Sequence, residues 1–190
     1  MLMYGDDPDI GLYWPARDPA IPPSQKADAF LDWVSSYYAP TPSVALITAD
    51  ALRKCTALAR TPTMRTLSPE DLERTVDRHV GPRAMRIART DLQIRRRLAR
   101  RAFSDADAVL PDVDVVTLWC DQSVWHTVWG AKVCKELIEE PAEPSKKKRR
   151  VSLVKVENAN HFVGFVRPSK LLSMLIILLY SSTGTNLKGW

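Results

Sequence analysis

VDVVTLWCD at residues 113–121 and VSLVKVENANHF at residues 151–162 are the two stretches that decide the fold. Both are rich in β-branched residues and contain no Gly or Pro, which is typical of a buried or half-buried strand. Each strand runs into a polar residue of catalytic type, Asp121 in the first stretch and His161 in the second. Ligands bind at the carboxyl edge of parallel strands in open α/β sheets. The pattern therefore predicts that Asp121 and His161 lie within hydrogen-bond reach of each other at such an edge.

Length and composition indicate a globular protein. A chain of 190 residues, with 45% hydrophobic and 26% charged residues, can form one domain with a core or one domain plus a small lobe. Only 7 glycines are present, which disfavours a function based on a Gly-rich phosphate loop. Cys55, Cys120 and Cys134 are odd in number and far apart, as free thiols in a reducing compartment are.

No signal for export or membrane insertion is visible in the sequence. The first residues, Met1–Tyr4, lead directly into Gly5-Asp6-Asp7, unlike a signal peptide. The longest apolar run, residues 171–180, falls short of the ~20 residues that cross a bilayer. We therefore expect no membrane span and a cytoplasmic location.

The first part of the chain, residues 1–110, reads as an all-helical lobe with an irregular, Pro-rich start. Apolar residues at helical spacing predict a helix from about Ser24 to Tyr38 and a second one over residues 44–60. Ser68-Pro69 is typical of a helix start and predicts a helix to about Val80. An Arg-rich helix is expected over residues 83–103.

The second part, residues 111–180, reads as β-α-β-α, followed by a loose tail at 181–190. A helix capped by Ser123 and a charged loop at 140–150 separate the two strands, and a last helix begins at about Pro168. Two parallel strands must be covered on both faces and leave most of their edges unpaired. Such a pair is expected to add to another sheet or to be the back part of a larger domain.

Several of these segments resemble parts of the α/β-hydrolases. LWCDQSVW (118–125) resembles their acid-bearing strand and turn, and ENANHF (157–162) resembles their histidine turn. FLDWVSSYY (30–38) resembles the helical cap that such enzymes insert after the first half of the sheet. The likeness is to fungal-type, epoxide-hydrolase-like members, and it covers about residues 1–172.

This resemblance implies a fold and an activity. The fold class would be α/β, the C-terminal portion of an α/β-hydrolase sheet with about two parallel strands and flanking helices, preceded by the cap-like lobe. The family orders its triad as nucleophile, acid and histidine, so Asp121 would be the triad acid and His161 the general base. The reaction would be hydrolysis of a small-molecule ester or epoxide, without a cofactor.

The sequence also departs from the family. G-x-S-x-G does not occur, since no two of the seven glycines are four residues apart, and no His-Gly oxyanion motif occurs either. After His161-Phe162 the family has an aromatic-acid pair where this chain has Val163-Gly164-Phe165, and the likeness ends at Leu172. We therefore expect a partial hydrolase that is inactive alone. Whether its nucleophile would be Ser or Asp stays open, and so does its oligomeric state.

The candidate residues have simpler alternative roles. Asp121 could cap the helix that begins near Ser123, and His161 could be a strand-end histidine hydrogen-bonded to backbone. We expect His126 to pack beside Trp125 and Trp129, and His79 to interact with a helix C-terminus. The spacings of Cys120, His126, Cys134 and His161 match no zinc signature, so no metal is expected.

Two basic segments support a different class of function, a non-enzymatic binding protein. The Arg-rich helix carries a stripe at positions 86, 89, 93, 97 and 100, which could bind nucleic acid or acidic lipid. No aromatics interleave with it for base stacking, so we expect a solvated or salt-bridged face and no specific nucleic-acid binding. Lys146–Arg150 resembles a nuclear-import signal, but basic loops of this size are common on protein surfaces, so we expect a surface loop. A third reading is a degenerate scaffold without activity.

Overall fold

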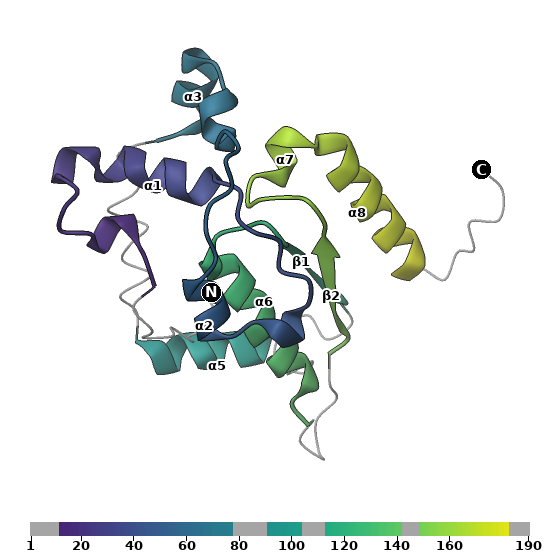
Figure 1. Cartoon of the computed structure of the whole chain (residues 1–190). Coiled ribbons are helices and arrows are strands. Elements are labelled where there is room, and N and C mark those ends of the chain that lie inside the picture. Colours follow the sequence, from purple (N-terminus) through teal and green to yellow (C-terminus); the bar gives the residue numbers. More distant parts are fainter. Residues whose placement is uncertain (1–11, 78–90, 104–112, 142–148, 183–190) are drawn as a thin grey trace.

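The computed structural model describes residues 12–77, 91–103, 113–141 and 149–182. A mostly helical N-terminal part is followed by two parallel strands with flanking helices (Figure 1). The α/β fold class expected from the sequence is therefore confirmed at this level. The N-terminal elements are η1 (Pro15–Arg17), η2 (Pro23–Gln25), α1 (Lys26–Ser35), η3 (Val44–Leu46), α2 (Ala49–Arg53), η4 (Thr63–Thr66), α3 (Pro69–Thr75) and α5 (Leu92–Phe103).

The helix expected over residues 44–60 is wrong in extent. The chain forms η3 and then the short helix α2, which ends at Arg53. Thr48 interrupts the pattern because its extended backbone and its hydroxyl, which accepts a hydrogen bond from Ala51 N at 3.1 Å, start a new helix. Beyond α2 the chain forms an antiparallel bridge between Tyr38 and Ala57, which a continuous helix would prevent.

Helix α3 begins where the sequence predicts it. Ser68 is its N-cap, with Oγ accepting a hydrogen bond from Asp71 N at 3.1 Å, and Pro69 is its first residue. The helix ends at Thr75, so the expected continuation is too long within the described residues. Positions 78–90, including His79 and the first part of the Arg-rich helix, lie outside the described residues. The rest of that helix is α5.

Strands β1 (Val115–Cys120) and β2 (Val151–Val156) pair in parallel, with Val115 opposite Val151 and Cys120 opposite Val156. Helix α6 (Trp125–Glu139) connects them, and its N-cap is Val124 without a side-chain hydrogen bond. The expected cap by Ser123 is therefore wrong. After β2 come α7 (Val163–Val166) and α8 (Pro168–Ser182), so the helix also includes the first two residues of the expected loose tail.

The core is built around α6, which contacts both strands, η3 and α5. Val124 packs with Trp33 and Val34 of α1, and Val128 packs with Ile47 and Leu52. Farther along α6, other apolar residues pack against Ala99 of α5. The helical part of the chain is thus attached to the strands through α6, which leaves the carboxyl ends of the strands next to α1 and η4.

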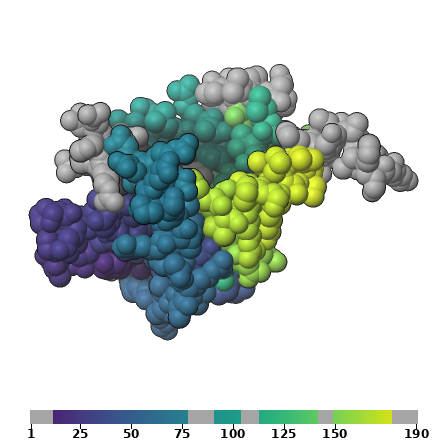
Figure 2. All heavy atoms as spheres, turned by 90° about the horizontal axis from the view of Figure 1, so that it is seen from above, coloured from purple at the N-terminus to yellow at the C-terminus, as the bar shows by residue number. Residues whose placement is uncertain are grey.

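Helix α8 extends outward from the turn after β2 and lies on the molecular surface (Figures 1 and 2). Large apolar side chains are exposed along it, including Leu172, Leu175, Ile176 and Ile177. In the described part of the chain, no helix is both long and apolar enough to cross a membrane.

Candidate functional site

Asp121 directly follows β1 and is fixed by its backbone on both sides. Its N–H donates to Val156 O at 3.2 Å, and its own carbonyl accepts a hydrogen bond from Thr41 N at 2.9 Å. Gln122 N then donates to Ala159 O at 3.0 Å, so the segments that follow β1 and β2 stay hydrogen-bonded beyond the ends of the strands. The backbone therefore places Asp121 alongside the turn that contains His161.

The Asp121 side chain is buried, with 6% of the residue exposed, and it points to the histidine turn. Its Oδ1 accepts a hydrogen bond from Ala159 N at 3.3 Å, two residues before His161. The alternative role of Asp121 as a helix cap does not hold, because α6 begins without a side-chain cap. The carboxylate instead anchors the backbone that carries the histidine.

His161 is an exposed residue whose ring meets Phe162 edge to face, with 5.4 Å between centroids. Desolvation by surrounding atoms lowers its pKa below the ordinary 6.5, which keeps the ring neutral at pH 7. A neutral imidazole can accept a proton, as a general base must. Among the described residues, no hydrogen bond joins the His161 ring to the Asp121 carboxylate or to backbone.

The structure thus brings the two candidate residues to the same edge of adjacent parallel strands, as the sequence predicts. The structure joins the Asp121 carboxylate by a hydrogen bond to the backbone of the histidine turn, and not to the imidazole of His161. Their roles as triad acid and general base stay predictions.

Asn160 is a key residue of this turn to which the sequence pattern assigned no role. It is 1% exposed, and its Nδ2 donates to Ser35 O at 2.6 Å and to Thr63 Oγ1 at 2.8 Å. Its Oδ1 accepts a hydrogen bond from Phe162 N at 3.0 Å, which closes the turn around His161. The sequence offered one signal for this role: Asn160 is a polar amide directly before the histidine, in a segment that is otherwise predicted to be half buried.

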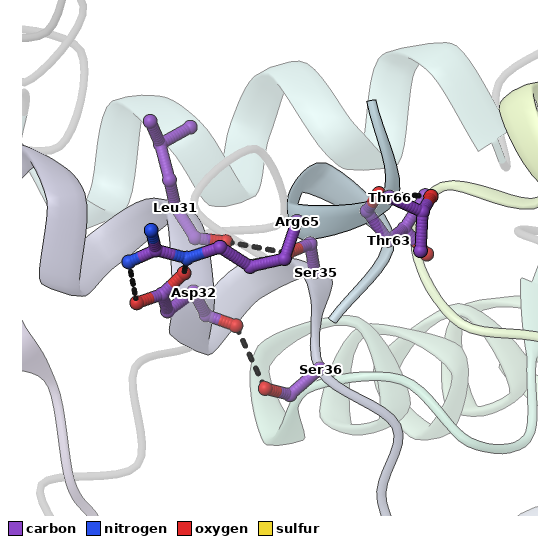
Figure 3. Close-up of polar contacts among 7 residues, drawn as sticks. All are labelled: Leu31, Asp32, Ser35, Ser36, Thr63, Arg65 and Thr66. Atoms are coloured by element: carbon purple, nitrogen blue, oxygen red, sulfur yellow. Dashed lines mark hydrogen bonds and ion pairs between the residues drawn. The ribbon is translucent and has the colours of Figure 1, made fainter. Parts of the chain in front are cut away.

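The partners of Asn160 are themselves held in place by α1 and η4 (Figure 3). Arg65 forms a two-pronged ion pair with Asp32, with both N···O distances 2.6 Å, and so joins η4 to α1. Ser35 Oγ donates to Leu31 O at 2.7 Å at the end of α1. The helical N-terminal part therefore positions the histidine turn through the buried hydrogen bonds of Asn160 to Ser35 and Thr63.

A pocket of about 290 Å³ lies beside this turn. It is lined by β1, the first half of α6 and the turn, and His161 and Ser123 are among its lining residues. Cys120 also lines it, and burial, reinforced by the charge of Asp121, raises the pKa of this thiol to about 11. Cys120 is therefore a neutral thiol at pH 7 and a poor nucleophile.

His126 has a structural position, as expected from its aromatic surroundings. Its ring stacks on Trp125 with centroids 3.9 Å apart and meets Trp14 and Trp33 edge to face at 4.7 and 5.1 Å. Burial, with a further contribution from the positive charge of Arg17, lowers the pKa of His126 to about 3. The ring therefore packs as a neutral group.

The potential metal ligands do not gather. In the described ranges of the chain, no group of three or more His, Cys, Asp and Glu residues is arranged to hold a metal ion. Cys134 is a buried residue of α6, and its thiol forms a hydrogen bond with the side chain of Thr117 on β1.

Parts of both basic segments lie within the described residues. On α5, positions 93, 97 and 100 of the expected stripe are exposed, and Arg100 forms an ion pair with Glu140 at 3.0 Å. Arg95, in contrast, is buried, at 8% exposure. Arg150 pairs with Asp114 at 3.0 Å, while residues 142–148 of the Lys/Arg loop lie outside the described residues.

Comparison with known proteins adds no family to this description. No protein-family model matches the sequence, and it matches neither a curated protein nor a solved structure.

Proposed function

We propose that this chain forms the acid-and-histidine part of an α/β-hydrolase-type site for small esters or epoxides. The observation that carries the proposal is the hydrogen bond from Ala159 N to Asp121 Oδ1. It joins the carboxylate after β1 to the histidine turn after β2, beside a pocket that His161 lines. This combination of acid, imidazole and pocket at the carboxyl ends of parallel strands is what hydrolytic chemistry in such folds uses.

Each residue has a defined part in this proposal. His161 is the general base, because its imidazole lines the pocket and is neutral at pH 7, so that a ring nitrogen can accept a proton. Asp121 is a positioning residue that acts on the histidine through the backbone of the turn. Hydrogen bonds of catalytic groups often tighten only when substrate is bound, so the missing Asp121–His161 contact is compatible with this assignment.

The nucleophile is the part that this sequence does not provide in the family's form. Without an elbow motif, the isolated chain is expected to turn over ester and epoxide substrates no faster than buffer. General-base assistance by a positioned histidine contributes about 10²–10⁴-fold once a nucleophile is in place.

The protein is expected to be located in the cytoplasm.

The test compares the isolated chain with a product that also contains the coding sequence preceding Met1. We expect p-nitrophenyl butyrate and styrene oxide to be stable with the isolated chain. A longer product carrying G-x-S-x-G or G-x-D-x-G should hydrolyse one of them and lose at least about 100-fold in kcat when His161→Ala is introduced. Equal activity of the His161→Ala variant would contradict the proposal, and His126→Phe serves as the control for loss of a structural histidine.

A second candidate function, binding of an acidic partner, is favoured by the exposed arginines of α5. Arg96, Arg97 and Arg101 are exposed on this helix. Such a face would bind nucleic acid through phosphate contacts, with an affinity that falls steeply with salt. Tight binding to one nucleic-acid sequence at physiological salt would favour this function over hydrolysis.

A further inference from the structure

The pocket beside His161 contains a polar group whose bonding capacity is unused. Ser123 lines the pocket and is only 2% exposed. Within the described residues, its Oγ is buried and has no hydrogen-bond partner. Buried hydroxyls in native proteins are almost always hydrogen-bonded, so an unpartnered one beside a cavity indicates a missing partner.

The two other hydroxyl groups that line the pocket already have hydrogen-bond partners. The side chain of Thr117 forms a hydrogen bond with that of Cys134. Thr127 Oγ1 donates to Val124 O at 2.9 Å, at the start of α6. The Cys120 thiol is protonated, as its pKa of about 11 implies, and a thiol is a weak donor. Ser123 is therefore the hydroxyl that a molecule in this pocket would use.

The size and lining of the pocket restrict what that molecule can be. A volume of about 290 Å³ is at the lower end for ligand pockets and is about ten times the ~30 Å³ that a water molecule occupies in the liquid. Leu118, Ala131, Val156 and Val163 supply apolar walls. The lining includes no Asp, Glu, Lys or Arg among the described residues, so nothing in it compensates a charged ligand.

We propose that Ser123 is a ligand-binding residue, and that the pocket takes a small, neutral, mostly apolar molecule with one oxygen acceptor such as a carbonyl. The serine hydroxyl donates to this oxygen, next to the His161 ring. Only one side-chain torsion positions the hydroxyl of a serine, so a rotation about this torsion is enough to turn the Ser123 hydroxyl toward the ligand. The inference rests on the proposed function, since the pocket is the same, and it narrows the substrate class to small uncharged carbonyl compounds.

The experiment measures binding of two probes of matched size, acetophenone and ethylbenzene, by ligand titration followed in amide NMR spectra. The full chain should bind acetophenone about three- to tenfold more tightly, which is the effect of one net hydrogen bond. Ser123→Ala should abolish this preference and leave ethylbenzene binding intact, which also shows that the variant is folded. Ser152→Ala is the matched control, because Ser152 is an exposed serine on β2 that does not line the pocket.

Two results would overturn the inference: equal binding of the two probes by the unmodified chain, or an unchanged preference in Ser123→Ala. Either would mean that the Ser123 hydroxyl does not contact a ligand. Failure of the proposed function gives a different pattern. In that case the turnover of the longer product is independent of His161, while the preference of the chain for acetophenone still depends on Ser123.

Discussion

Replacing Asn160 by Ala should destabilise the protein strongly, because this side chain joins the histidine turn to the helical lobe. The substitution removes three hydrogen bonds, those to Ser35 O, to Thr63 Oγ1 and from Phe162 N. Each contributes about 1 kcal/mol net, and buried partners left unsatisfied cost more, so the expected loss in the free energy of unfolding is about 3 kcal/mol. Ordinary domains have only about 5–15 kcal/mol in total.

Urea unfolding followed by tryptophan fluorescence measures this loss. With a slope of about 2 kcal/mol per M, the midpoint should fall by about 1.5 M. A double-mutant cycle with Thr63→Val should show coupling of about 1 kcal/mol, since the two side chains share a bond. A midpoint that falls by less than about 0.25 M, or additive effects of the two substitutions, would refute the reasoning.

Three other predictions concern protonation and the surface. His126 has a folded pKa of about 3, so the unfolded chain takes up its proton first, at about 6.5, and stability should fall by up to about 2 kcal/mol from pH 7 to pH 5. Urea unfolding at both pH values should show a smaller fall in His126→Phe, and an equal fall would count against the buried neutral ring. The unmodified chain should self-associate in sedimentation velocity through the apolar side chains exposed on α8, and Leu172→Gln with Ile177→Gln should reduce this association. Equal sedimentation of the variant and the unmodified chain would contradict this prediction. Fluorescence anisotropy should show only weak DNA binding that falls steeply with salt, as exposed arginines on α5 produce. Tight binding to one DNA sequence would contradict it.

The strands could be predicted from the sequence because their signal is local. Residues 151–156 have the β-branched content of a strand, and β2 has these bounds. The start of α3 was equally readable, since Ser68 and Pro69 act within one turn. Residues 44–60 were misread because apolar spacing continues there, while Thr48 and the pairing of Tyr38 with Ala57 end the helix. That pairing joins distant segments, which periodicity does not report.

The candidate site was predictable only in part for the same reason. The parallel order of the strands placed Asp121 and His161 at one edge. The partners of Asn160, which are Ser35 and Thr63, lie 125 and 97 residues away in the chain, and no local pattern connects them. Ser123 was misassigned as a cap because serine favours that position, whereas α6 begins one residue after Val124.

The Asp121 carboxylate holds the histidine turn through the Ala159 amide, and hydrogen exchange of that amide measures the strength of this contact. Removing a hydrogen bond to a charged group costs about 1.5 kcal/mol at the lower end, which corresponds to about a tenfold faster exchange. Asp121→Ala should therefore speed exchange of the Ala159 amide about tenfold. Asp114→Ala, which removes an ion pair with Arg150 just before β1, should leave it unchanged. Exchange at Ala159 that is the same in Asp121→Ala and in the unmodified chain would contradict the account.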